Sequence, residues 1–167
     1  MISASHNDFL DNGIKIFNED GEKISRDIEK RIEKYLKSKL LPVETSKIGK
    51  AYRFDESGPR YVEFCKSTVP SDISFSSLRI VIDCANGACY KVSPEIFKEL
   101  GAEVIIIGNK PDGYNINQDC GSTNPQIIKD AVIKHRADYG ISLDGDGDRV
   151  IIVDEKGNIL DGDDLLY

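Results

Sequence analysis

The sequence predicts an α/β fold with a mixed, mainly parallel sheet and flanking helices, preceded by an incomplete α/β segment. From residue 78 onward, strand-like apolar runs alternate with helix-like stretches, an order typical of parallel sheets with right-handed crossovers. A hairpin pattern at residues 150–160 adds an antiparallel edge. The length, 167 residues with 40% hydrophobic and 31% charged side chains, suits one domain, or one domain with part of another.

The first elements are short and follow a polar loop at residues 3–8. A strand is predicted from Gly13 to Phe17, where apolar side chains alternate with polar ones. Residues 18–21 have the composition of a turn, and Glu22 to Ile24 is a candidate for the returning strand. These residues therefore suggest a small hairpin.

A first helix is predicted from Arg26 to Lys39, with Ser25 as its N-cap. Pro42 ends the helical region, and residues 42–58 are predicted to be irregular. The apolar positions of this helix recur at helical spacing and form one stripe, made of Ile28, Ile32, Tyr35, Leu36 and Leu40.

A second helix is predicted from Arg60 to Thr68, directly after Gly58 and Pro59. We expect Tyr61, Phe64 and Cys65 on its buried side. The serine-rich stretch at residues 70–77 is interpreted as a linker to the second half of the chain.

The second half begins with a buried strand at Leu78 to Asp83. A helix is predicted from Ala88 to Leu100, with Gly101 at its C-terminal end, and a second strand from Glu103 to Ile107. A long loop then covers residues 108–124.

A third helix at Pro125 to Arg136 and a strand at Asp138 to Leu143 complete the alternation, and Val150 to Asp154 pairs with Ile159 and Leu160 as the hairpin. Ligands of parallel α/β sheets bind beyond the carboxyl ends of the strands, which is where residues 144–149 are expected. The apolar face of the third helix consists of Ile127, Ile128, Ala131, Val132 and Ile133.

The charge balance excludes several partners. The formal net charge is −7, and no basic stripe is present, so nucleic acid is not an expected partner. No apolar run approaches the length of a membrane span and no signal peptide precedes the first motif, so we expect a cytoplasmic protein with no membrane partner. The cysteines show no CxxC pair, and we interpret them as reduced core or half-buried residues: Cys65, Cys84, Cys89 and Cys120.

Three carboxylates separated by single glycines follow the last strand of the alternation: Asp144, Asp146 and Asp148. In an extended segment, residues i, i+2 and i+4 point the same way, so the three acids would converge. Each like-charged pair at ~4 Å would repel by about 4 kcal/mol at an effective dielectric of ~20. A hard divalent cation, Mg²⁺ or Ca²⁺, resolves that repulsion. Arg149 adds a guanidinium suited to a phosphate group.

Two other interpretations of this acidic loop are possible. An EF-hand calcium loop would match the acid spacing, but its sixth position requires glycine and here is Arg149, and its flanks should be helical rather than strand-like. A solvated glycine-rich turn is the plain structural alternative.

The opening loop places a hydroxyl beside an imidazole at Ser5 and His6. Adjacent residues cannot adopt the geometry of a catalytic triad by themselves, so this pair alone is more typical of a polar turn.

Four ordered segments together carry a resemblance to a known family: residues 1–15, 82–88, 115–123 and 144–149. The chain resembles the α-D-phosphohexomutases, in their active-site serine loop, their entry to the second domain, a further family segment and their metal loop. The sequences of the serine loop and the metal loop most resemble those of the bacterial branch that acts on glucosamine phosphates. The sequence departs from the usual family pattern at Asp8, where proline is frequent, and at Asn124, where histidine is frequent.

The resemblance implies a mechanism and its residues. Ser5 would carry the phosphoryl group as phosphoserine, and Lys15 would act as general acid and base, with His6 either contacting phosphate or shaping the loop. The metal ligands would be Asp144, Asp146, Asp148 and a phosphate oxygen on Ser5, with Mg²⁺ as the cofactor and Arg149 as a phosphate-binding residue. Asn86 and Asn115 would be structural.

The resemblance also implies an organisation. Residues 1–72 would be the C-terminal part of the first domain and residues 73–167 the second domain, so we expect a fragment that is inactive alone. The substrate would be a hexosamine or hexose phosphate. Unpartnered first-domain surfaces would favour self-association.

Other functions stay open. One is a mutase for mannose and glucose phosphates, and another is a non-catalytic metal-binding α/β module. A haloacid-dehalogenase-type phosphatase would need an aspartyl nucleophile near the first strand and gives Ser5 no role.

Overall fold

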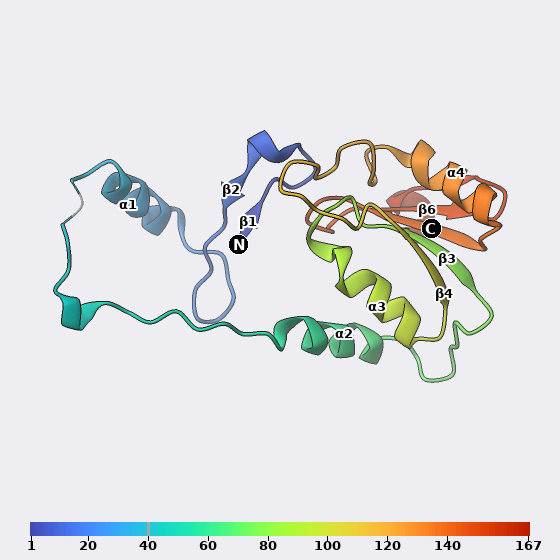
Figure 1. The fold of residues 1–167 in the computed structure, drawn as a ribbon, viewed down its shortest axis with the longest axis horizontal. Helices are drawn as coiled ribbons and strands as arrows, with labels where there is room; N and C mark the ends of the chain where they lie inside the picture. The colour runs from blue at the N-terminus through green and yellow to red at the C-terminus, as the bar shows by residue number, and fades with distance from the viewer. Residues whose placement is uncertain (40) are drawn as a thin grey trace. The chain divides into compact units, whose positions relative to one another are not determined.

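The computed structural model describes residues 1–39 and 41–167, so Leu40 of the predicted stripe lies outside the described residues. The chain divides into two compact units (Figure 1). The first contains residues 1–2 and 14–55, and the second contains residues 3–13 and 56–167. The predicted domain boundary at residue 72 stays a prediction.

The first unit has little regular structure. Its helix α1 covers Arg26–Leu36, and its short 3-10 helix η2 covers Thr45–Lys47. Phe17 and Lys23 form an isolated antiparallel bridge, so the predicted hairpin is present in reduced form. Ser25 stands at the N-cap of α1, as predicted, but its side chain makes no capping hydrogen bond.

The apolar side chains of the first unit are poorly covered. Within α1, Tyr35 and Leu36 are mostly exposed, and the described residues of this helix include no buried one. A hollow of about 310 Å³ is lined chiefly by aliphatic side chains, namely Ile14, Ile16, Ile24, Ile32 and Leu36, with Glu29 and Glu33 at its side. Self-association through these residues stays a prediction.

Two short strands accompany the serine loop. Strand β1 (Ile2–Ser3) pairs with β2 (Gly13–Ile14), and the 3-10 helix η1 (Phe9–Asp11) lies between them in sequence. The strand predicted from Gly13 to Phe17 is thus regular only over its first two residues.

The second unit contains the predicted α/β layer. Its sheet has the order β4-β3-β5-β6-β7. Strands β3, β4 and β5 are parallel, whereas β6 is antiparallel to β5 and to β7, so the prediction of a mixed α/β sheet with flanking helices is confirmed. Its strands are β3 (Arg79–Asp83), β4 (Glu103–Ile107), β5 (Tyr139–Leu143), β6 (Val150–Asp154) and β7 (Ile159–Leu160).

Two apolar clusters lie on opposite faces of β3, because successive strand residues point to opposite sides. Val81 packs with Ile128 and Val132 of α4 (Pro125–His135), whereas Ile80 and Ile82 pack near Phe97 of α3 (Val92–Glu99). Figure 1 shows α3 and α4 on either side of the strands. This packing fixes the carboxyl ends of β3 and β5, where the candidate site lies.

Two predicted helices differ in detail. The helix expected from Ala88 to Leu100 is split into the 3-10 turn η3 (Ala88–Tyr90) and α3, and the Ala88 N–H donates to the carbonyl oxygen of Gly145. Helix α2 (Ser57–Ser67) turns Val62 inward against α3 and leaves Tyr61 and Phe64 exposed. The predicted buried side of α2 was therefore wrong for those two aromatic residues.

The cysteines have the predicted burial. Cys84 and Cys120 are buried, and Cys65 and Cys89 are half-buried. Burial raises the pKa of Cys84 to about 12 and that of Cys120 to about 11, so both thiols are neutral at physiological pH. The unit ends with helix α5 (Gly162–Leu166). None of the helices in the described part of the chain has the length and apolarity needed to cross a bilayer.

Candidate metal centre and serine loop

The acidic loop connects β5 to β6 at the edge of the sheet where β5 ends. Asp144 is fully buried, and its Oδ1 accepts hydrogen bonds from the N–H groups of Gly147, Asp148 and Arg149, each at 3.1 Å. The Gly147 N–H also reaches the Asp144 carbonyl oxygen, with Gly147 at φ +75°. The loop is therefore a tight turn around one carboxylate, not the extended segment that the sequence suggested.

The three carboxylates nevertheless converge. Asp144, Asp146 and Asp148 each offer an oxygen, and these oxygens lie within 4.8 Å of one another. The second oxygen of Asp144, Oδ2, is buried, and no hydrogen-bond donor among residues 1–39 and 41–167 reaches it. Burial raises the pKa of Asp144, and the negative charges of Asp148 and Asp146 raise it further. The hydrogen bond from the Arg149 N–H lowers this pKa, but by less than burial raises it. A divalent cation would compensate this buried oxygen and the mutual repulsion, so the residues present fit such an ion.

The serine loop lies against the acidic loop within the second unit. The Ser3 hydroxyl donates to Asp146 Oδ2 at 3.1 Å, and the Ser5 N–H donates to Ser3 Oγ at 3.0 Å. Ala4 is buried, and Ser5 adopts a left-handed backbone at φ +54°. Strained non-glycine residues often mark functional sites because the surrounding structure must hold them in place. The structure thus brings Ser5 and the acidic loop together.

The other predicted site residues are less closely joined. His6 Nδ1 lies 3.4 Å from Ser5 Oγ. Arg149 is exposed and lines a hollow of about 390 Å³ with Asp148, Ser122 and Thr123. Lys15 belongs to the first unit, where its backbone pairs with Met1, and its role as general acid and base stays a prediction.

Sequence reasoning missed two residues that join the loops. Asn117 donates to the carbonyl oxygens of Ser5 and Asn7. At Gly145 an added Cβ would collide with the Ser5 carbonyl oxygen and would lie 2.7 Å from Asn117 Nδ2. A glycine between acids was the only sequence signal for this close approach, and Asn117 was noted only as part of residues 115–123, one of the segments that carry the family resemblance.

Asp83, at the end of β3, anchors the neighbouring loops. Its Oδ1 accepts from the Ala85 N–H at 3.0 Å, and its Oδ2 accepts from the Gly121 N–H at 2.7 Å. Asn86 and Asn115 tie the same region together by side-chain hydrogen bonds to Lys110 and Asp112, consistent with structural roles.

We expect Asp83→Asn to lower the free energy of unfolding by about 1–3 kcal/mol, because the new amide NH₂ would face a buried backbone N–H. Burial raises the pKa of Asp83 despite its hydrogen bonds, so the native protein holds this proton more tightly than the unfolded chain. This tighter proton binding stabilises the native protein at pH values below the pKa of Asp83 in the unfolded chain. The stabilisation is lost as the pH rises through the pKa of Asp83 in the native protein. Asparagine does not titrate, so the deficit of Asp83→Asn should shrink between pH 4 and 7.

Urea unfolding at both pH values tests this, with the exposed Asp130→Asn on α4 as the control. Among the described residues, Asp130 accepts a side-chain hydrogen bond from Gln126 on the same helix alone, so its replacement should change stability little. A deficit for Asp83→Asn that grows with pH would contradict the prediction.

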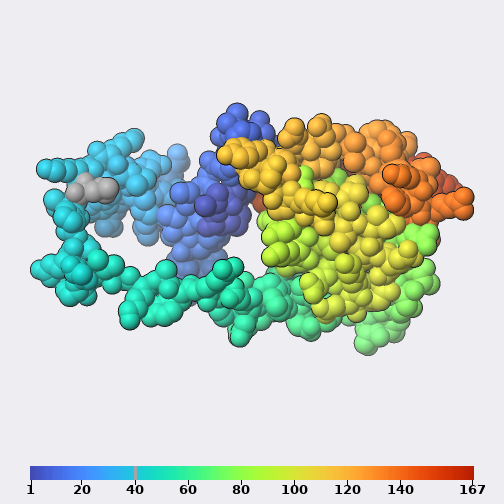
Figure 2. All heavy atoms as spheres, in the orientation of Figure 1, coloured from blue at the N-terminus to red at the C-terminus, as the bar shows by residue number. Residues whose placement is uncertain are grey.

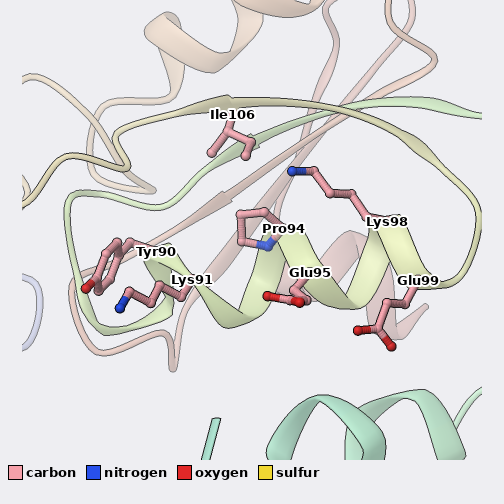
Figure 3. Close-up of a pocket in the computed structure, with 7 residues that line it drawn as sticks. All are labelled: Tyr90, Lys91, Pro94, Glu95, Lys98, Glu99 and Ile106. Carbon is pink, nitrogen blue, oxygen red and sulfur yellow. The ribbon is translucent and has the colours of Figure 1, made fainter. Parts of the chain in front are cut away.

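Another hollow, of about 330 Å³, lies between α3 and β4, and Figure 3 shows the side chains that line it. Its two lysines and two glutamates balance in charge, and one of the latter, Glu99, pairs with Lys66 of α2. It is lined by Tyr90, Lys91, Pro94, Glu95, Lys98, Glu99 and Ile106. Nothing in this lining resembles the convergent polar groups of the acidic loop.

Figure 2 shows the long loop that contains Asn117 (yellow to light orange) at the surface of the second unit.

Comparison with known families resolves what kind of chain this is. The profile of the phosphoglucomutase/phosphomannomutase alpha/beta/alpha domain II matches residues 59–157, and that of domain I matches residues 1–41. The chain belongs to the phosphoglucomutase/phosphomannomutase family. Ser5 lies in the part that matches domain I, and Asp144, Asp146 and Asp148 lie in the part that matches domain II.

Curated relatives agree with this assignment. A phosphoglucosamine mutase of Legionella pneumophila is 56% identical over all 167 residues, which cover 37% of that protein. A phosphoglucosamine mutase of Psychromonas ingrahamii is 53% identical over all 167 residues of this chain, which cover 38% of that protein. The chain therefore spans little more than a third of the relatives it matches.

Solved structures show the same fold. A phosphoglucomutase/phosphomannomutase family protein from Burkholderia thailandensis matches with a TM-score of 0.63 and 27% identity, over 95% of this chain and 33% of that one. A putative phosphomannomutase from Thermus thermophilus matches with a TM-score of 0.70 and 24% identity, over 95% of this chain and 37% of that one.

Proposed function

We propose that this chain carries the phosphoryl-transfer half of a phosphosugar mutase, which interconverts glucosamine 6-phosphate and glucosamine 1-phosphate. One observation carries the proposal: the Ser5 loop and the carboxylate cluster lie together, joined by the hydrogen bond from Ser3 Oγ to Asp146 Oδ2. The names of the relatives support an isomerase of this class.

In the proposed reaction, phosphoserine at Ser5 gives its phosphoryl group to a free hydroxyl of the sugar monophosphate. The bond from phosphorus to Ser5 Oγ breaks as a bond from phosphorus to the sugar oxygen forms, and Lys15 takes the proton of that hydroxyl. The resulting bisphosphate reorients, the bond from its other phosphorus to the sugar oxygen breaks as a bond from that phosphorus to Ser5 Oγ forms, and Lys15 returns the proton to the sugar oxygen. His6, 3.4 Å from Ser5 Oγ, would contact the phosphate or shape the loop.

The charges needed for this transfer are supplied by the acidic loop. Asp144, Asp146 and Asp148 would hold Mg²⁺ with a phosphate oxygen on Ser5 as a further ligand. The bound cation would neutralise charge on the phosphoryl group. Arg149, which lines the adjacent hollow, would bind phosphate oxygens through its guanidinium. We further propose a cytoplasmic enzyme that has neither nucleic acid nor membrane as a partner.

Glucosamine is the preferred sugar because both curated relatives named above are phosphoglucosamine mutases. The alternatives are a mutase for mannose and glucose phosphates, which the names of the structural matches suggest, and a metal-binding module without catalysis.

An activity assay with three substrates separates these possibilities. We expect the full-length protein carrying this chain to isomerise glucosamine 6-phosphate faster than the glucose and mannose phosphates, and the 167-residue chain alone to show no turnover. The chain covers only 37% of its Legionella relative, and the remaining part is expected to bind the sugar. Full activity of the chain alone, or no activity of the full-length protein on any of the three, would contradict the proposal.

A further inference from the structure

We propose that Asn117 is a positioning residue that clamps the serine loop and thereby aims the Ser5 hydroxyl. The role rests on the proposed function of Ser5, but the clamp itself is a structural claim that can be tested without turnover. Asn117 lies in the long loop between β4 and α4, more than a hundred residues from the serine loop in sequence.

The contacts of the amide are specific. Asn117 Nδ2 donates to the carbonyl oxygen of Ser5 at 3.0 Å and to that of Asn7 at 2.8 Å. Both partners are acceptors, so only the NH₂ group can serve them, and it uses both of its hydrogens. The carbonyl atom of the same amide, Oδ1, is buried and meets no donor in the described part of the chain. A carboxylate in this place would therefore repel two carbonyl oxygens and find no compensating donor.

The backbone of Asn117 is itself held in place. Asn117 has a left-handed backbone at φ +58°, a conformation that asparagine tolerates better than most residues, and its N–H donates to the Ala85 carbonyl oxygen at 2.8 Å. Ala85 in turn donates its N–H to Asp83. The backbone of Asn117 is thus held by the segment that follows β3, which Asp83 anchors.

Both peptide groups that flank Ser5 are therefore held by side-chain hydrogen bonds. The N–H of Ser5 is bound by Ser3, which contacts Asp146, and the carbonyl of Ser5 is bound by Asn117. The same carbonyl oxygen lies so close to Gly145 that no Cβ would fit there. Fixing both peptides holds Ser5 at φ +54° and restricts the directions open to its Oγ.

Two variants test the clamp in the full-length protein. Asn117→Asp keeps the shape of the side chain but cannot donate, and Asn117→Gly suits the left-handed backbone but has no amide. We expect each to lower kcat by about 10²-fold, because misplacing a reacting group by about 1 Å costs that much. We also expect amide hydrogens of residues 3–8 to exchange at least about tenfold faster, as in any segment that opens locally.

The matched control is Asn115→Asp in the same loop, whose side-chain bonds run to Lys110 and Asp112 instead. It should leave both kcat and the exchange of residues 3–8 unchanged. Magnesium affinity of the Asn117 variants should stay within about threefold of the original, because the three carboxylates remain, whereas a general loss of structure would lower it together with thermal stability.

Unchanged exchange of residues 3–8 in both Asn117 variants would overturn the proposal, whatever happens to turnover. Faster exchange with unchanged kcat would also overturn it, because the clamp would then not aim Ser5. If instead Ser5 proves unnecessary for turnover, the proposed function fails while the exchange result still decides whether the clamp exists.

Discussion

Replacing Ser5 by alanine is expected to lower turnover of sugar phosphates by more than about 10³-fold, because alanine has no oxygen to carry a phosphoryl group. The loss should be chemical rather than structural. The Ser5 backbone is held by Ser3 and Asn117, and both hydrogen bonds use main-chain atoms that alanine retains. Serine and alanine both carry a Cβ and share a similar strain of about 1 kcal/mol at φ +54°, whereas Ser5→Gly relieves that strain and also lacks the hydroxyl, so the pair of variants separates strain from chemistry.

The measurement combines kinetics with phosphopeptide mass spectrometry of the full-length protein. The original protein should carry phosphate on Ser5, and both variants should lack it and lack turnover. Ser67→Ala is the control, because Ser67 is an exposed serine of α2 whose hydroxyl only donates to the Phe64 carbonyl oxygen. Normal turnover of Ser5→Gly would remove the phosphoryl carrier from the proposed mechanism.

The strands were predictable because their signals are local. Val150–Asp154 and Ile159–Leu160 were predicted with their observed bounds, since runs of branched apolar residues end at the turn residues 155–158. The orientation of α2 was not predictable in this way. The apolar side chains of α2 are spread around the helix, so its own pattern does not define a buried face. Its contact with α3 decides that Val62 and not Phe64 is buried.

The candidate site shows the same division. The spacing of the three acids predicted their convergence, but not the turn that produces it, because that turn depends on the buried Asp144 carboxylate collecting three backbone N–H groups. The link between the two loops was invisible in sequence. It depends on a hydrogen bond between Ser3 and Asp146 and on an amide at Asn117, and each joins residues more than a hundred positions apart.

Asp144→Asn is expected to weaken Mg²⁺ binding by at least about 10²-fold, since even residues that only orient metal ligands change affinity by 10–100-fold when replaced. Asparagine keeps an oxygen that can accept the N–H groups of Gly147, Asp148 and Arg149, so the turn should persist. What is lost is the charge, together with the buried Oδ2 that lacks a donor. The variant therefore removes the proposed metal ligand while retaining the loop.

Asp154→Asn is a closely matched control, because Asp154 also holds a turn by accepting the N–H groups of Lys156 and Asn158. It ends β6, outside the cluster of three carboxylates. Calorimetric titration with Mg²⁺ and with Mn²⁺ should show reduced affinity for Asp144→Asn alone, with a similar melting temperature for both variants. Equal affinity in both would mean that the cation binds elsewhere. Loss in both would mean that binding follows the net charge of the chain, because each variant removes one carboxylate while only Asp144 belongs to the cluster.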